Sequence, residues 1–227
     1  MKLSIIIPIY NEKDTILEIL KKVQAANING IEKEIIIVDD FSNDGTKEIL
    51  KTVENPLIKI FYQQANMGKG KAVQIGFNNL SGDIVLIQDA DLEYDPNDYI
   101  NLINPILNGD YEVVYGSRLL KKENRHGHIK YFIGGIFITL ITNLLYNSHL
   151  TDEPTGYKVF KNNIIKSIQI KSNGFEWEPE ITAKILKKGI KIKEVPINYY
   201  PRTRSQGKHI RIKDGLLAIW VLIKNRF

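Results

Sequence analysis

The sequence predicts a single α/β domain, with a mainly parallel sheet flanked by helices. Three observations support this prediction. The chain has 227 residues, enough for one well-buried core. Over its first half, short apolar runs alternate strictly with amphipathic segments, as is typical of right-handed βαβ units. The apolar content of 43% and the charged content of 25% are those of an ordinary globular protein.

Strands and helices alternate from the N-terminus to residue 115. The first helix places Ile16, Ile19 and Val23 on one face, at helical spacing. The predicted strands are Ser4–Ile9, Glu34–Val38, Ile58–Tyr62, Ile84–Gln88 and Val113–Tyr115. The predicted helices between them are Asp14–Ala25, Thr46–Val53, Lys71–Leu80 and Asn97–Leu107. Ligands of such sheets bind beyond the carboxyl ends of the strands, so we expect the site there.

The alternation fades after Arg118. We expect helices over Tyr131–Tyr146, Asn162–Ile168 and Pro179–Lys188, a strand over Ile190–Val195, a further strand over Ile197–Tyr200, and a final amphipathic helix. Tyr131–Tyr146 is the longest apolar stretch, yet it falls short of the ~20 residues that cross a bilayer. We therefore expect no transmembrane helix. We interpret this stretch as a core helix under the site, with an interfacial membrane helix as the alternative.

The net charge is +5, and the positive excess is concentrated in Lys121–Lys130 and Arg202–Lys213. Such segments favour phosphate groups or an anionic membrane surface as partners, and a solvated charged surface is an equal alternative. There is no cysteine, which excludes disulfides and thiolate metal sites and fits a reducing compartment. The N-terminal apolar run is broken by Pro8, so it reads as a strand and not as a signal peptide.

Two carboxylates follow the buried run Ile84–Ile87. Asp89 and Asp91 are two residues apart, so on an extended segment their side chains point the same way. Mg²⁺ commonly takes one or two protein carboxylates and completes its coordination with substrate phosphates and water. The pair therefore predicts an enzyme that grips a diphosphate through a divalent metal.

Two further segments follow predicted strands. Asp39 and Asp40 end the second strand, where carboxylates can accept hydrogen bonds from ribose or from a base. A turn explains Asp44 and Gly45, which follow, but it does not explain the two adjacent carboxylates. The segment Asn66–Lys71 combines glycines, which allow close approach to a ligand, with lysines that attract phosphate. It lacks the spacing of a P-loop, and a flexible connection with solvated lysines is the alternative.

These motifs occur in one order along the chain: Ile7–Glu12, Val38–Thr46, Asn66–Gly70, Asp89–Asp91 and Tyr115–Arg118. Together they resemble the inverting family 2 glycosyltransferases of the GT-A fold. Within that family the chain is most similar to the dolichyl-phosphate and polyprenyl-phosphate sugar transferases, such as mannosyl- and glucosyltransferases. The resemblance covers essentially the whole length, and it is stronger before Arg118 than after it.

The resemblance implies one Rossmann-like GT-A domain over residues 1–227. Residues 1–118 would bind the nucleotide sugar, and residues 119–227 would form an extension on the acceptor side. The implied donor-binding residues are Pro8, Tyr10, Glu12, Val38, Asp40, Asn66, Lys69 and Asp89. The implied ligands of Mg²⁺ or Mn²⁺ are Asp89, Asp91 and Glu93. Related transferases often carry Gln at the position of Glu93, so its role as a third ligand and the identity of the metal stay open.

The resemblance places the acceptor in the second half. The implied phosphate ligands are Arg118, Arg202, Arg204 and Lys208, and guanidinium groups suit phosphate oxygens in paired contacts. The implied catalytic residues are Asp91, Arg118 and Asp152. Asp152 would orient the acceptor or act as a base, and a turn-stabilising role before Pro154 is the alternative. Glu176 and Glu178 are interpreted as first-turn acids of the following helix in preference to active-site residues.

The expected reaction is transfer of a hexose, with inversion, from GDP- or UDP-hexose to a polyprenyl or dolichyl phosphate. A phosphate acceptor is already an anion and needs no general base, whereas a sugar hydroxyl needs one. We expect location at the cytoplasmic face of a membrane, held peripherally or through a small membrane subunit, and no nucleic-acid partner. Transfer to a saccharide hydroxyl is the alternative reaction.

Two other classes of protein are less consistent with the sequence. A noncatalytic module that binds nucleotide sugars or a membrane surface would not require the acidic pair. A nucleotidyltransferase would carry a loop rich in Gly and Arg near its first strand, and Ser4–Glu12 has none.

Overall fold

The structure is a computed structural model that describes residues 1–124, 129–202 and 212–227. Within those residues, a seven-stranded sheet has the order β3-β2-β1-β4-β6-β5-β7. The strands are β1 (Lys2–Ile9), β2 (Glu32–Asp39), β3 (Ile58–Tyr62), β4 (Ile84–Ile87), β5 (Val113–Ser117), β6 (Lys158–Lys161) and β7 (Ile192–Pro196). The strands β1 to β4 pair in parallel, as do β5 and β7, which confirms the predicted mainly parallel sheet.

Strand β6 was not predicted, and it runs antiparallel to both of its neighbours, β4 and β5. It has only four residues and begins with Lys158, which is fully buried. The ammonium group of Lys158 donates to the carbonyl oxygens of Glu153 (2.7 Å) and Thr155 (2.8 Å), and it lies 4.2 Å from the ring centroid of Tyr115. A pattern of hydrophobic residues cannot indicate this strand, because the burial of Lys158 depends on these polar contacts.

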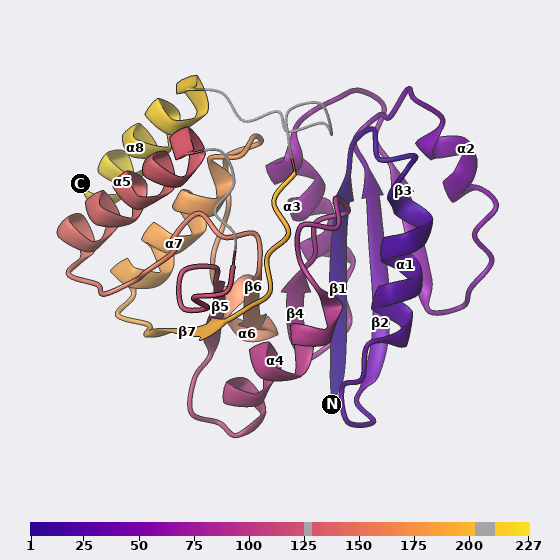
Figure 1. Cartoon of the computed structure of the whole chain (residues 1–227), viewed down its shortest axis with the longest axis horizontal. Helices are drawn as coiled ribbons and strands as arrows, with labels where there is room; N and C mark the ends of the chain where they lie inside the picture. The colour runs from indigo at the N-terminus through magenta and orange to yellow at the C-terminus, as the bar shows by residue number, and fades with distance from the viewer. Residues whose placement is uncertain (125–128, 203–211) are drawn as a thin grey trace.

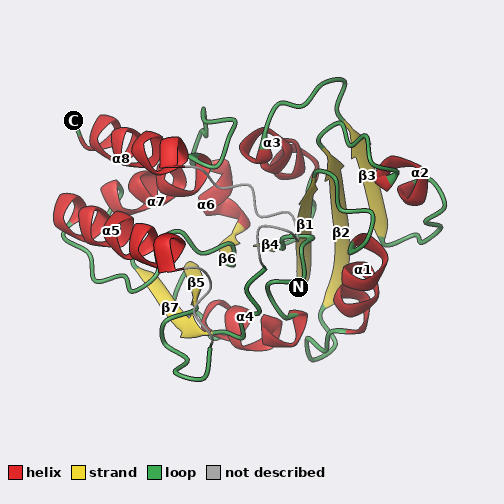
Figure 2. Cartoon of the chain, turned by 45° about the horizontal axis from the view of Figure 1, so that its top comes forward, coloured by secondary structure: helices red, strands yellow, loops and turns green. Residues whose placement is uncertain are grey.

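The helices cover both faces of the sheet, as Figures 1 and 2 show. They are α1 (Ile16–Ala25), α2 (Thr46–Leu50), α3 (Lys69–Asn79), the 3₁₀ turn η1 (Pro96–Asp98), α4 (Tyr99–Leu107), α5 (Ile129–Tyr146), α6 (Asn162–Lys166), α7 (Trp177–Lys187) and α8 (Ile212–Arg226). Along β1, Ile5 and Ile7 enter the core layer beneath α1 and α4, while Ile6 enters the layer beneath α3 and α7. This alternation is the period of two that a strand imposes.

Two sequence predictions for the second half are wrong. Helix α5 is not a core helix under the site: it packs on α7 and α8 at the outside of the molecule (Figure 2). Residues 197–200 do not form a strand; Tyr199 makes only an isolated bridge to Tyr94. Among the helices of the described ranges, none is both long enough and apolar enough to cross a bilayer.

A buried carboxylate joins several strands at the edge of the sheet opposite to the carboxyl ends. One oxygen of Glu34, on β2, accepts from the hydroxyl of Ser4 (2.5 Å) and the backbone NH of Ser81 (2.5 Å), and the other lies 3.1 Å from the Lys59 ammonium on β3. Burial by itself raises the pKa of Glu34, but these hydrogen bonds outweigh burial and lower the pKa to about 2. The ionised form of Glu34 therefore stabilises the fold.

We predict that Glu34→Gln lowers the free energy of unfolding by about 2–3 kcal/mol at neutral pH. The folded pKa lies below the ordinary value of 4.5, so this stabilisation is complete above pH 4.5 and is lost as pH falls toward 2. Urea unfolding of both proteins across this range should show their difference shrinking toward low pH. The exposed Glu18→Gln serves as a control with no such trend. A constant difference at every pH would contradict the assignment.

Candidate active site

The segment after β4 is held by a buried glutamine. The side-chain oxygen of Gln88 accepts from the hydroxyls of Tyr99 and Tyr157, both at 2.7 Å, and its amide donates to the carbonyl of Asp89 (2.8 Å). Hydrogen bonds from two different elements therefore fix the backbone that carries Asp89 and Asp91. The sequence analysis did not single out Gln88, although its place at the end of a strand is a usable signal.

Asp89 contacts the lysine that begins α3. The Lys69 ammonium lies 2.8 Å from Asp89 and 2.9 Å from Glu178 on α7. Burial alone would lower the pKa of Lys69, but these carboxylates outweigh it and raise that pKa, so the lysine is charged. Glu178 does lie in the first turn of its helix, as predicted, and it also belongs to the site. A Cβ atom at Gly156 would collide with the Asp89 carboxylate, so only glycine allows this close approach.

Asp91 contacts an arginine that is 111 residues away in the sequence. The Arg202 guanidinium lies 3.0 Å from Asp91 and 3.1 Å from Glu12, which follows β1. The backbone NH of Arg202 donates to the Glu93 side chain (2.7 Å). Burial, followed by repulsion from Asp89 and Glu93, raises the pKa of Asp91 to about 7. Arg202 therefore bridges the loops after β1 and β4 as a partly buried counter-charge.

This edge of the sheet fits a hard divalent cation through two carboxylates. Burial, followed by repulsion from Asp89, raises the pKa of Asp91, and both carboxylates contact cationic side chains in this structure. In the part of the chain that the structure describes, no three His, Asp or Glu side chains form one metal-binding group, so Glu93 is not gathered with the pair as a third ligand. Two protein carboxylates are still sufficient for Mg²⁺ or Mn²⁺ when a diphosphate supplies further oxygens.

Asp40 organises the loop before α3. Its carboxylate accepts from the backbone NH groups of Met67 and Gly68, both at 2.7 Å, and from the side chain of Gln63 (2.6 Å). Gly68 has a φ of 96°, and a Cβ there would collide with the Asn173 carbonyl, so this position requires glycine. The structure therefore shows Asp40 as the residue that positions the Asn66–Gly70 loop; its contact with a nucleoside stays a prediction.

The other predicted donor-binding residues divide into two groups. Pro8 and Val38 lie opposite each other in the β1–β2 register, and both are buried in the sheet. Tyr10 is 40% exposed and Asn66 is exposed, so these two side chains are accessible at the rim of the site. Glu12 is placed by its backbone NH, which donates to the Thr46 hydroxyl (2.9 Å). Pro8 and Val38 therefore lie in the core of the sheet, and Tyr10 and Asn66 lie at the accessible rim.

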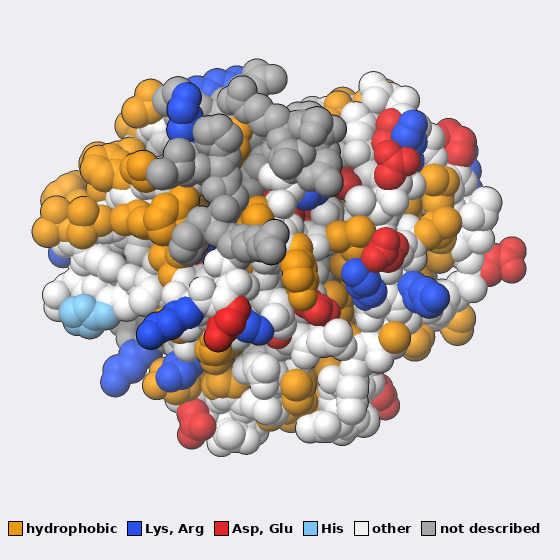
Figure 3. All heavy atoms as spheres, in the orientation of Figure 1, with side chains coloured by type: hydrophobic (Ala, Val, Ile, Leu, Met, Phe, Trp, Pro, Cys, Tyr) orange, Lys and Arg blue, Asp and Glu red, His pale blue; other side chains and the backbone are white. Residues whose placement is uncertain are grey.

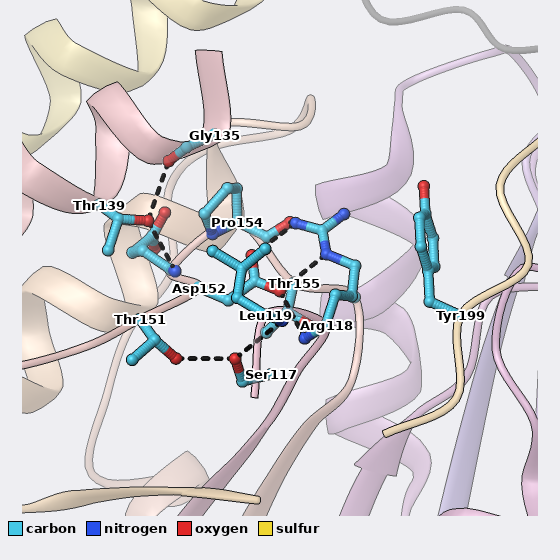
Figure 4. A network of polar contacts seen from close by, with 12 residues as sticks. Ser117, Arg118, Leu119, Gly135, Thr139, Thr151, Asp152, Pro154, Thr155 and Tyr199 are labelled. Carbon is cyan, nitrogen blue, oxygen red and sulfur yellow. Dashed lines mark hydrogen bonds and ion pairs between the residues drawn. The ribbon is translucent and has the colours of Figure 1, made fainter. Parts of the chain in front are cut away.

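Arg118 and Asp152 form a two-pronged ion pair (Figure 4). The Arg118 guanidinium donates to both oxygens of Asp152, at 2.7 and 2.6 Å, and also to the Pro154 carbonyl (3.2 Å). Burial alone would lower the pKa of Arg118, but the Asp152 carboxylate outweighs it and raises that pKa. The guanidinium also lies 5.3 Å from the ring centroid of Tyr199. Arg118 is therefore a rigid, permanently charged group.

The loop that carries Asp152 is held from both sides. The Glu194 side chain on β7 accepts from the backbone NH groups of Thr151 (2.7 Å) and Asp152 (2.9 Å). On the other side, the backbone NH of Glu153 donates to the Thr139 hydroxyl (3.0 Å), which links the loop to α5. Figure 4 shows Thr139 and its contact close to Arg118. The sequence analysis missed Glu194, because a single acid in a short strand carries no local signal.

The last two predicted phosphate ligands, Arg204 and Lys208, lie outside the described residues. Arg202 is described, and it contacts the acids of the donor side as well as preceding the predicted acceptor loop. The predicted division at residue 118 therefore does not separate the side chains in space: Arg202 of the second half meets Glu12 and Asp91 of the first.

Comparison with solved structures shows which fold this is. Glucosyl-3-phosphoglycerate synthase from Mycobacterium tuberculosis, solved with Mn²⁺, UDP and phosphoglyceric acid, superposes with a TM-score of 0.76 at 18% sequence identity. The match covers 99% of this chain and 78% of that one. The predicted GT-A fold is therefore confirmed.

Sequence comparison leads to the family. A dolichol-phosphate mannosyltransferase of Pyrococcus furiosus is 30% identical over 214 residues, which cover 92% of this chain but only 59% of that protein. A UDP-N-acetylglucosamine–dolichyl-phosphate N-acetylglucosaminyltransferase of Methanococcus voltae is 31% identical, with 97% and 95% of the two chains covered. The family model for glycosyl transferase family 2 matches residues 4–168. The chain is a member of glycosyl transferase family 2.

Proposed function

We propose that this protein transfers a hexose from a nucleotide sugar to a polyprenyl phosphate, with inversion at the anomeric carbon. The observation that carries the proposal is the ion pair of Arg118 and Asp152, in which both oxygens of Asp152 accept from the guanidinium. A carboxylate paired in this way is a poor general base, which favours a nucleophile that already carries a negative charge. A lipid phosphate meets that requirement, and two relatives are named for acting on dolichyl phosphate.

The donor side of the proposed site is the edge that carries Asp89 and Asp91. These residues would hold Mg²⁺ or Mn²⁺, and the ion when bound would neutralise the charge that develops on the leaving nucleoside diphosphate. Lys69, already charged beside Asp89, would add a second positive group near the diphosphate. Tyr10 and Asn66, accessible at the rim, would contact the nucleoside.

The acceptor side of the proposed site centres on Arg118. Its guanidinium is oriented by Asp152, so little side-chain entropy remains to be lost when a phosphate binds. Asp152 therefore acts as a positioning residue in this proposal and not as a base. The alternative, transfer to a saccharide hydroxyl, would need a carboxylate free to take a proton. Since the acceptor is a lipid, we also propose that the protein works peripherally at a membrane.

Incubating the protein with radiolabelled UDP- or GDP-hexose and polyprenyl phosphate tests the reaction. We expect label to move into organic solvent when Mn²⁺ is present. Asp91→Asn should reduce this transfer by about 10³-fold or more, and it should also weaken Mn²⁺ binding measured by electron paramagnetic resonance. The exposed Asp110→Asn is the matched control. A water-soluble labelled product would favour the saccharide alternative, and full transfer by Asp91→Asn would exclude the metal site.

Replacing either member of the Arg118–Asp152 pair should affect acceptor binding above all. We expect Arg118→Lys and Asp152→Asn each to raise the KM for polyprenyl phosphate by about 10- to 100-fold. Arg118→Lys removes the guanidinium group, and Asp152→Asn leaves that group without the carboxylate that orients it. The KM for the nucleotide sugar should stay nearly unchanged. A loss confined to kcat in Asp152→Asn, with loss of the acidic limb of the pH–rate profile, would show that Asp152 is a base instead.

Arg202 occupies the carboxylates that a metal would need, so it competes with the metal in the substrate-free protein. We predict that Arg202→Met binds Mn²⁺ several-fold more tightly than the parent protein when no nucleotide is present, because Asp91 loses its counter-charge. Turnover should nevertheless fall. Arg226→Met, at an exposed position, is the control. Unchanged Mn²⁺ affinity would show that the guanidinium does not compete.

A further inference from the structure

Helix α5 exposes a continuous apolar face. Its residues Ile133, Phe137, Leu140 and Leu144 recur at helical spacing and are all exposed, and Leu144 is 83% exposed. The opposite face is buried, with Thr142 fully inaccessible. An exposed stripe of this size on a helix that is already packed on its other side marks an interaction surface.

Helix α8 lies against α5 and extends the same surface. Its residues Leu216, Trp220 and Ile223 are exposed at the same spacing, while Leu222 on the other side is fully buried in a cluster with Tyr146 of α5. Figure 3 shows hydrophobic side chains gathered over the position that α5 and α8 occupy in Figure 1. The two helices thus form one apolar surface, here called the α5–α8 face.

The charges around the α5–α8 face are mainly positive. The two helices contain Lys130, Lys213, Lys224 and Arg226 but only one acid, Asp214. The Lys224 ammonium lies 4.7 Å from the ring centroid of Trp220, so a cation sits beside an aromatic ring of the apolar surface. An apolar face with aromatic residues and basic neighbours is suited to the headgroup region of an anionic bilayer.

The α5–α8 face connects directly to the phosphate-binding part of the proposed site. Thr139 of α5 accepts from the backbone NH of Glu153, next to the Asp152 that holds Arg118. Gly135, one turn earlier, approaches Pro154, whose carbonyl accepts from Arg118. The loop that holds Arg118 therefore packs on the inward face of α5, and a bilayer on the outward face would be separated from that loop by the thickness of one helix, about 10 Å.

We propose that the α5–α8 face docks the protein on an anionic lipid bilayer and presents Arg118 to the phosphate of a membrane-embedded acceptor. The inference deepens the proposed function, since it rests on a lipid acceptor. A second copy of the chain is the less suitable occupant of this face. Two such faces in contact would bring their lysines and arginines together, which opposes association, whereas anionic lipids attract them.

Vesicle binding of the whole chain without substrates tests the proposal. We expect co-sedimentation with vesicles of phosphatidylcholine and phosphatidylglycerol, weaker binding to phosphatidylcholine alone, and weaker binding at high salt. The double variant Leu144→Gln/Trp220→Gln should bind about tenfold less tightly or worse, because exposed apolar groups no longer enter the lipid. The control Leu17→Gln/Leu57→Gln changes two exposed apolar positions elsewhere and should bind as the parent does. Circular dichroism and thermal unfolding check that both variants fold.

Equal vesicle binding by the parent protein and the Leu144/Trp220 variant would overturn the proposal. So would an absence of vesicle binding accompanied by a concentration-dependent dimer that this variant abolishes, since a second copy would then cover the face. Transfer to a short, water-soluble polyprenyl phosphate separates the two proposals. If the parent performs this transfer but ignores vesicles, only the docking surface fails; if it binds vesicles but performs no transfer, only the proposed reaction fails.

Discussion

The pairing of partly buried acids with partly buried cations at the carboxyl edge of the sheet is the constraint on which the site depends. Asp89 is held with Lys69, and Asp91 with Arg202. Removing one member of such a pair leaves the charge of the other without its partner in a poorly hydrated site. The loops after β1 and β4, the start of α3 and the segment after β7 are therefore tied to one another through charge. An arrangement that holds acids together with exchangeable counter-charges is suited to a metal and a diphosphate.

A second consequence of this arrangement is that the two sides of the proposed site are coupled. Arg202 reaches Glu12 and Asp91 on the donor side, yet it directly precedes the basic loop expected to bind the acceptor. Arg118 lies on the acceptor side, and the loop of its partner Asp152 continues to Gly156, which lies against Asp89. Occupation of either side must alter the charges felt by the other, because both depend on the same short loops.

Helices α5 and α8 determine which surface of the molecule lies next to the acceptor side of the proposed site. α5 is tied to the loop of Asp152 through Thr139, and α8 packs on α5 and α7. The apolar side chains that these helices expose face away from the sheet. The proposed reaction at a membrane needs such a surface on the helix that supports the loop of Arg118, and the packing of α5 on that loop meets this need.

Much of the fold follows from local patterns in the sequence. Ser4–Ile9 is a short, nearly continuous apolar run that is buried along its length, and Ile16, Ile19 and Val23 recur at helical spacing. Both are local signals, so the parallel half of the sheet was predictable. The acidic pair was equally predictable, because two carboxylates after a buried strand are unusual in any fold. The order of the motifs led from there to the family.

Only the tertiary structure decided the rest. Strand β6 begins with a lysine whose burial depends on the Glu153 and Thr155 carbonyls, and no periodicity signals such contacts. The apolar stretch of α5 is compatible with a core helix or a surface helix, and packing on α7 and α8 decided between them. The pairings of Arg202 with Asp91 and of Arg118 with Asp152 join residues that are distant in the sequence. Local sequence determines which residues are charged and which faces are apolar, but folding in three dimensions determines which charges meet.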